Sequence, residues 1–170
     1  GLEPATLVAR VQIPPAAPFQ NTHEKVKDFK SKSLQLLPMY KRMLLCVTSA
    51  TPKEVIEAAV RLCSKETKVY VLHVVHLLTD FVQKEVSKEF AWIIDLFKKT
   101  GLKCDLNIVE STDVKRAIIS FAKKNSCDVI VTGVIPRKGL LGFFSESISD
   151  HVVKNAPCTV ILVRKAGQLV

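Results

Sequence analysis

The segment between residues 133 and 149 concentrates residue types that bind phosphate. It contains Gly139 and Gly142, two adjacent cations at Arg137 and Lys138, and several serines. The N–H groups of a glycine-bearing loop and the positive end of a helix dipole attract phosphate oxygens, and Arg and Lys complement their charge. A surface loop whose glycines serve turns explains the same pattern, so the spacing alone leaves both interpretations open.

Two shorter segments compete for the same role. Thr48–Thr51 supplies hydroxyl groups after the first predicted strand of the alternating region, and Val74–His76 follows the second. In an open parallel sheet, ligands bind outside the carboxyl ends of the strands, where the strand order reverses. We therefore expect at least one of these three segments to border a ligand site.

Residues that usually carry catalysis or hold metals form no recognisable group. His73 lies inside a predicted strand and is interpreted as a core or interface residue. Ser145, Ser147 and Ser149 have no His/Asp partner at a recognisable spacing, so helix capping is their first role. The five cysteines include no C-x-x-C pair and no metal-ligand spacing. We expect a protein that is not an enzyme and that binds no metal.

Strands and helices alternate from residue 42 onward, because short apolar runs predict strands and apolar spacings of three and four predict helices. The strands are expected at 42–48, 68–75, 102–109, 127–133 and 158–164. The helices are expected at 51–64, 80–100, 113–124 and 146–155, with Thr51 and Pro52 starting the first and Gly101 ending the second. This order predicts an α/β fold, a three-layer sandwich around a five-stranded parallel sheet, with 102–109 at an edge.

Residues 1–41 precede this unit and have a different composition. Four prolines within residues 1–20 favour a linker or an extended arm. Residues 22–37 are rich in lysine and allow a short amphipathic helix. The predicted organisation is an N-terminal extension at 1–41, an α/β domain at 42–165 and a tail at 166–170.

The composition excludes several protein classes. The 170 residues contain 25 Lys and Arg against 16 Asp and Glu, a net charge of +9, and 48% are hydrophobic. This hydrophobic content excludes wholesale disorder, and the longest apolar run, 69–78, is too short to span a membrane. Because the cations are spread over predicted helix faces and residues 22–42, no nucleic-acid partner is expected. Unpaired cysteines indicate a reducing compartment, so a cytoplasmic location is expected.

Two segments carry a specific family pattern. The first is Asp128-Val-Ile-Val-Thr-Gly133, and the second runs from Ser147-Ile-Ser-Asp150 through Ala156-Pro157-Cys158 to the apolar stretch ending at Arg164. On these motifs, residues 42–165 resemble the universal stress protein domain, which has a Rossmann-like nucleotide-binding fold. Leu72–Val75 also looks like the end of that family's second strand.

The resemblance implies a nucleotide loop that this sequence keeps only in part. Family members that bind ATP carry a Gly-x2-Gly-x9-Gly-Ser/Thr loop and an Asp after the first strand. Here Gly133 and Ser147 match the two ends of the loop. Pro136 and Glu146 replace the inner glycines, and Thr48 replaces the Asp. Pro136 has no N–H for a phosphate, and a Glu146 carboxylate in the first turn of the following helix would repel one.

The resemblance therefore implies a non-catalytic regulatory domain with a degraded ATP-binding loop, and hence weak or no ATP binding. ATP or another adenine nucleotide is the only ligand class it implies. The implied cofactor-binding residues are Thr48, Val74, Thr132, Gly133, Arg137, Gly139, Gly142, Ser147, Ile148 and Ser149. It also implies a homodimer through the last strand, where edge pairing would cover Thr159, Val160, Ile161, Leu162 and Val163.

Other interpretations stay open at this stage. A member that binds ATP or AMP could use a shifted loop at Gly139 and Gly142. A soluble regulatory domain of a larger protein, such as a membrane transporter, agrees with the extension and with a chain that starts at Gly1 instead of Met. A flavodoxin-like electron carrier is disfavoured because Thr48–Thr51 lacks the loop glycine, and a response regulator because paired acids are missing there.

Overall fold

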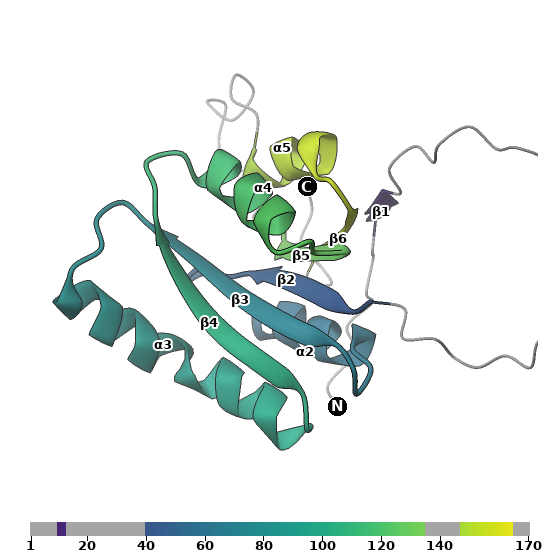
Figure 1. Cartoon of the computed structure of the whole chain (residues 1–170), viewed down its shortest axis with the longest axis horizontal. Helices are drawn as coiled ribbons and strands as arrows, with labels where there is room; N and C mark the ends of the chain where they lie inside the picture. Colours follow the sequence, from purple (N-terminus) through teal and green to yellow (C-terminus); the bar gives the residue numbers. More distant parts are fainter. Residues whose placement is uncertain (1–9, 13–39, 135–146, 165–170) are drawn as a thin grey trace, which may run out of the picture.

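Alternating strands and helices build the predicted three-layer sandwich (Figure 1). The computed structural model describes residues 10–12, 40–134 and 147–164. The strands are β1 (Arg10–Gln12), β2 (Arg42–Cys46), β3 (Lys68–Val75), β4 (Lys103–Glu110), β5 (Val129–Gly133) and β6 (Thr159–Val163). The helices are α2 (Lys53–Leu62), α3 (Asp80–Lys99), α4 (Val114–Lys124) and α5 (Ile148–Asn155). The α/β fold with its five-stranded parallel sheet is therefore confirmed.

The sheet has the strand order β1-β6-β5-β2-β3-β4, and β2 to β6 pair in parallel. From the central β2, the chain adds β3 and β4 on one side and then returns to add β5 and β6 on the other. The strand order therefore reverses between β2 and β5, which is where such sheets bind ligands. The predicted edge strand at 102–109 is confirmed as β4, at one end of the sheet.

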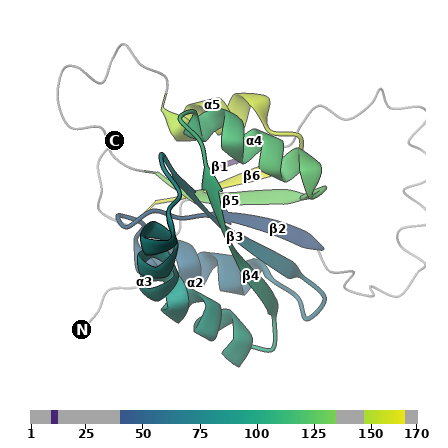
Figure 2. The ribbon, with the colours of Figure 1, turned by 60° about the vertical axis from the view of Figure 1, so that its left-hand side comes forward.

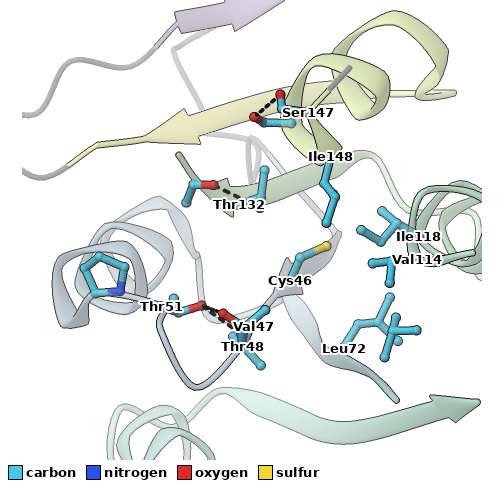
Figure 3. A pocket seen from close by; sticks show the side chains of 14 residues that line it. Cys46, Val47, Thr48, Thr51, Leu72, Val114, Ile118, Thr132, Ser147 and Ile148 are labelled. Carbon is cyan, nitrogen blue, oxygen red and sulfur yellow. Dashed lines mark hydrogen bonds between the residues drawn. The ribbon is translucent and has the colours of Figure 1, made fainter. Parts of the chain in front are cut away.

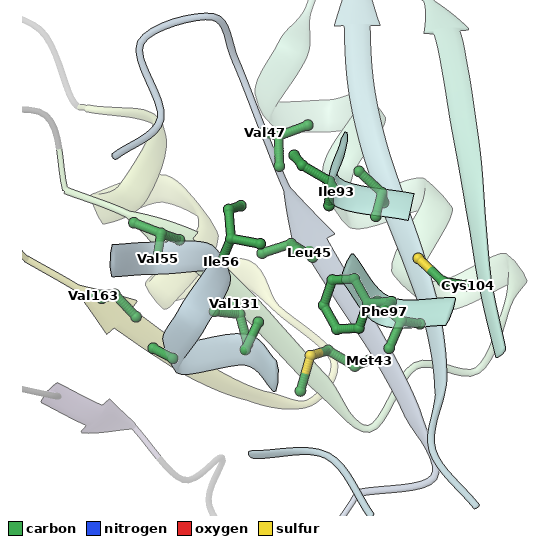
Figure 4. Packing of buried hydrophobic residues seen from close by; sticks show 14 of the residues in the cluster. Met43, Leu45, Val47, Val55, Ile56, Ile93, Phe97, Cys104, Val131 and Val163 are labelled. Carbon is green, nitrogen blue, oxygen red and sulfur yellow. The ribbon is translucent and has the colours of Figure 1, made fainter. Parts of the chain in front are cut away.

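Two apolar cores cover the two faces of the sheet. Figure 2 shows α2 and α3 on one face and α4 and α5 on the other. On the α2–α3 face, Phe97, Ile93 and Ile56 pack with Met43 and Leu45, and none of these side chains is more than 1% exposed (Figure 4). Full burial of one such side chain contributes about 1.5–3 kcal/mol, so the two cores hold the strand ends in fixed positions.

The ends of α3 agree with the prediction, whereas the starts of α2 and α5 do not. The Thr79 hydroxyl caps α3 by accepting a hydrogen bond from the Val82 N–H at 3.2 Å, and Gly101 follows its last turn with φ of +78°. Thr51 was expected to cap α2, but Pro52 is the N-cap residue and no side chain caps this helix. The Thr51 hydroxyl instead accepts from the Thr48 N–H at 2.8 Å.

Strand β1 is not predicted by the sequence. Three residues of the N-terminal extension pair antiparallel with β6 and make the sheet six-stranded. The prediction of a linker or an extended arm over residues 1–20 missed this pairing. The predicted helix at 22–37 and the predicted tail at 166–170 lie outside the described residues. Within the described ranges, the helices are all too short or too polar to cross a membrane.

Candidate functional site

A pocket lies at the carboxyl ends of β2 and β5, at the point where the strand order reverses (Figure 3). Its volume is about 240 Å³. Typical small-molecule pockets range from about 300 to 1,000 Å³, so the described walls enclose a space for a small ligand or for part of a larger one. The position follows from topology, because α2, which follows β2, and α5, which follows β5 in the sequence, lie on opposite faces of the sheet.

The structure brings together most of the residues expected to bind a cofactor. Seven of the expected residues line this pocket, namely Thr48, Val74, Thr132, Gly133, Ser147, Ile148 and Ser149. Arg137, Gly139 and Gly142 lie outside the described residues. The loop after β2, the end of β3, the end of β5 and the start of α5 therefore meet at one place.

The pocket also has walls that sequence reasoning missed. They are Cys46, Val47, Pro52, Leu72, Val114 and Ile118, whereas Thr51 belongs to the segment Thr48–Thr51 that the sequence does predict. Val114 and Ile118 belong to the apolar stripe of α4, and Figure 3 shows both side chains facing the pocket across from Cys46. The apolar spacing in 113–124 predicts a helix, but no sequence signal shows that the first turn of this helix borders a ligand site.

The loop after β2 satisfies its own polar groups. The Thr51 N–H donates to the Thr48 carbonyl at 2.9 Å, and the Thr48 N–H donates back to the Thr51 hydroxyl at 2.8 Å. The Ala50 N–H donates to the Thr48 hydroxyl at 3.3 Å. This closed turn presents threonine hydroxyls to the pocket where the family resemblance expects an Asp, so this wall is polar but uncharged.

Gly133 has a packing role at the end of β5. A Cβ at this position would lie 3.2 Å from Val55 Cγ2, so a larger residue would require the Val55 side chain to move by a few tenths of an ångström. The following residue, Val134, donates its N–H to the Val163 carbonyl at 3.0 Å and continues the ladder with β6. Close packing against α2 therefore favours a glycine here, whether or not a phosphate binds beside it.

A capping box fixes the start of α5. Ser147 accepts from the Asp150 N–H at 3.0 Å, and its own N–H donates to the Asp150 carboxylate at 3.4 Å. The expectation that Glu146 lies in the first turn of this helix is wrong, because the helix begins at Ile148 and its first-turn acid is Asp150. Glu146 itself lies outside the described residues. The negative charge that complements the helix dipole is therefore supplied one turn later than expected.

Cys46 is the one thiol in the described pocket wall, and it is unreactive. Burial raises its pKa from the ordinary value of 9.0 to about 12, and the neighbouring Cys127 and Cys158 add to the shift. A thiol with this pKa is protonated at neutral pH and is a poor nucleophile. In Figure 3 its sulfur faces the pocket near Ile148, so it contributes an apolar surface.

His73 is a structural residue next to the site, as expected. Its Nδ1 lies 3.0 Å from the Val47 carbonyl oxygen, and its ring centroid lies 4.9 Å from that of Phe90. The lining itself contains hydroxyl groups and apolar side chains, and no Asp, Glu, His, Lys or Arg belongs to its described part. No group of three metal-ligating side chains occurs among the described residues. The described lining therefore suits binding of a partly apolar ligand and holds no acid–base pair.

Comparisons with known proteins agree with this fold. The model of the universal stress protein family matches residues 98–164. A universal stress protein of Methanocaldococcus jannaschii is 27% identical over 89 residues, which cover 52% of each chain. The chain thus spans about half the length of this curated relative.

Solved structures extend the similarity to the whole α/β unit. A universal stress protein in complex with cAMP has a TM-score of 0.62 at 14% identity, over 75% of this chain and 98% of that one. A universal stress protein from Archaeoglobus fulgidus in complex with dAMP has a TM-score of 0.57 at 21% identity, over 74% of this chain and 98% of that one. Residues 98–164 of this chain are therefore similar to the universal stress protein family, and the α/β unit has the fold seen in these structures.

Proposed function

We propose that the pocket binds the adenosine part of an adenine nucleotide, and that the domain is a non-catalytic regulatory module that holds the phosphates weakly. Its position at the reversal of strand order supports a nucleotide site. The proteins of similar fold that were solved with cAMP and dAMP support an adenine nucleotide as the ligand class.

The observation that carries this proposal is the composition of the described lining. Leu72, Val74, Val114, Ile118 and Ile148 provide apolar surface. An aromatic base that leaves water gains free energy on such a surface. Threonine and serine hydroxyls border the same space and can both donate and accept hydrogen bonds, as a ribose or the edge of a base requires. A volume of about 240 Å³ suits this part of a nucleotide better than a whole triphosphate.

Several features argue that phosphates add little affinity. Thr48 supplies no charge for a bound metal ion, and Pro136 supplies no N–H. The Asp150 carboxylate lies in the first turn of α5 and already complements the dipole of that helix. A bound phosphate would therefore gain less from this helix start and would face the repulsion of the carboxylate.

The decisive experiment compares adenosine, AMP and ATP with Mg²⁺ by isothermal titration calorimetry. The proposal predicts that all three bind within about threefold of one another, since the shared adenosine makes the main contacts. Tighter binding of ATP by tenfold or more would favour the alternative in which Arg137 and the Gly139/Gly142 loop hold the phosphates. No saturable binding of any of the three would overturn the proposed ligand class.

A matched pair of variants locates the binding site. Ile148 is 41% exposed and lines the pocket, so Ile148→Trp is expected to fill part of the space and to weaken adenosine binding at least tenfold. Leu77 is 64% exposed and lies outside the described lining, so Leu77→Trp should leave the affinity unchanged. Equal affinities in the two variants would place the ligand elsewhere.

The absence of catalysis is tested separately. The described lining offers no general acid or base and no carboxylate for a magnesium ion. We therefore expect ADP formation with saturating ATP to equal the rate without protein, also at high protein concentration. A rate that rises in proportion to protein, and that Ile148→Trp abolishes, would contradict the non-catalytic assignment.

A further inference from the structure

Strand β1 lies on the outer edge of β6, at one end of the sheet (Figure 1). The register pairs Arg10 with Leu162, Val11 with Ile161 and Gln12 with Val160, in antiparallel direction. All other described strand pairs of the sheet are parallel. Without β1, β6 would therefore be the outermost strand and would present one row of unpaired N–H and C=O groups.

The β6 edge has none of the features that protect an open edge strand. Thr159–Val163 contains no charged residue, no proline and no glycine. Val160, Ile161 and Val163 are at most 4% exposed, since helices cover both faces of this strand. An apolar edge strand of this kind pairs readily with any free strand, so it needs a cover.

The chain can supply that cover to its own β6 without strain. The antiparallel direction leaves Gln12 beside Val160, at the same end of the sheet at which β2 starts with Arg42. That start is anchored, because the Lys41 and Arg42 N–H groups donate to the Asp128 carboxylate at 2.7 and 3.0 Å. From β1 to β2 is three strand spacings, about 14 Å. The 29 residues of segment 13–41 can span far more than this, at about 3.3 Å per residue.

The same pairing is also short. It comprises three residue pairs, whereas β3 and β4 share eight. Few hydrogen bonds hold β1, so it can leave the sheet without disturbing the pairing of the other strands. A second copy of β6 offers a longer antiparallel partner of five residues about a twofold axis.

We propose that β1 is a removable intramolecular cover that keeps the protein monomeric, and that its release lets two copies pair through their β6 edges. The homodimer expected from the sequence then requires a state in which β1 has left β6. The inference rests on the strand pairing and is independent of the nucleotide pocket.

Sedimentation equilibrium over a range of protein concentrations tests this proposal. The full chain is expected to be a monomer, and a chain lacking residues 1–12 a dimer. A double variant, Val11→Pro with Gln12→Pro, should behave like the deletion. The N–H groups of two adjacent strand residues point to opposite sides of the strand. One of the two prolines therefore removes an N–H group that points toward β6. Thr6→Pro with Leu7→Pro makes the same change before β1 and should leave the monomer intact.

A peptide added in trans shows whether the edge itself is the dimer interface. A synthetic peptide of residues 7–15 should convert the deletion dimer to monomer, and a peptide of the same composition in scrambled order should not. Circular dichroism and thermal melting confirm that each variant is folded. A full chain that is already dimeric, a deletion that stays monomeric at the highest concentration, or a deletion that forms open-ended aggregates would each overturn the proposal.

Discussion

The two edges of the sheet are protected in different ways. The β4 edge carries exposed charges at Lys103, Asp105 and Glu110, and Asp105 pairs with Lys68 at 3.2 Å. The β6 edge carries no charge and is covered by β1. Charged side chains and covering segments are alternative protections against edge-to-edge association. The burial of each strand explains the difference. One face of β4 reaches water and can carry charged side chains, whereas both faces of β6 lie under helices and cannot.

The largest expected effect comes from placing a charge on each edge. Ile161 is 4% exposed and Ile108 is partly buried, and both pack in the core on the α2–α3 face. Ile161→Lys should lower the free energy of unfolding by roughly 4 kcal/mol, because the ammonium has no path to water. Ile108→Lys should cost only about 1 kcal/mol, because the lysine can extend its charge past the open edge. Urea denaturation of both variants provides the comparison.

The corresponding valine variants are the control. Ile161→Val and Ile108→Val should each cost about 1 kcal/mol, since both remove one methylene from the same core. If Ile161→Lys and Ile108→Lys lower the free energy of unfolding equally, β6 is no more enclosed than β4. That result would contradict the proposed difference between the two edges.

A second difference concerns a carboxylate in the middle of the sheet and a carboxylate at the β4 edge. Asp128, just before β5, accepts two backbone N–H groups from Lys41 and Arg42, whereas Asp105 on β4 contacts an exposed lysine. Asp128→Ala should cost about 2 kcal/mol, because hydrogen bonds to charged groups contribute more than neutral ones. Asp105→Ala should cost less than about 1 kcal/mol, as exposed ion pairs do. Asp128→Asn keeps an acceptor and should recover part of the loss in thermal melts. The same cost at both positions would contradict this assignment.

Much of the β2–β6 unit could be predicted because its signals are local. Thr79 and Gly101 mark the ends of α3 by their side-chain and backbone chemistry, and both positions agree with the structure. Seven expected pocket residues meet because parallel strands bring their carboxyl ends to one edge. The open position of 102–109 followed from its alternating pattern, which is the pattern of a strand with one wet face.

The features that could not be predicted depend on distant contacts or on competition between nearby groups. Strand β1 has three residues, and its partner lies about 150 residues further along the chain, so no periodicity marks it. The Thr51 hydroxyl had two local uses, capping α2 or closing the turn with Thr48, and the turn prevailed. Ser147 and Asp150 form the capping box that starts α5, although the helix was expected to begin at Glu146.

The thiols near the two edges should respond equally to alkaline pH. Burial raises the pKa of Cys104 on β4 and of Cys158 next to β6 from 9.0 to about 12 in both cases. Above pH 9.0 the unfolded chain loses these protons first, so stability falls as pH rises through the window between 9.0 and 12. Cys104→Ala and Cys158→Ala should flatten the slope by the same amount in urea denaturation series.

Each alanine also leaves a small cavity, which lowers the free energy of unfolding by the same amount at every pH. The slope of this free energy against pH therefore reports only the titration of the thiol. A flattened slope in only one variant would mean that the pKa of the other thiol is not raised in the folded protein.

The smallest expected effect is a difference in amide exchange between the two edges. Outward-facing N–H groups of β6 are paired with β1, whereas no strand in the described part of the chain pairs with the outer side of β4. Residue-resolved hydrogen exchange by NMR should therefore find these β6 amides about fivefold slower than those of β4, a difference of about 1 kcal/mol. The factor is modest because a three-residue ladder opens easily. Inward-facing amides of both strands should exchange far more slowly and serve as the internal reference. Equal rates at the two outer edges would mean that β1 spends little time on β6, and that β6 lacks the protection that charge provides for β4.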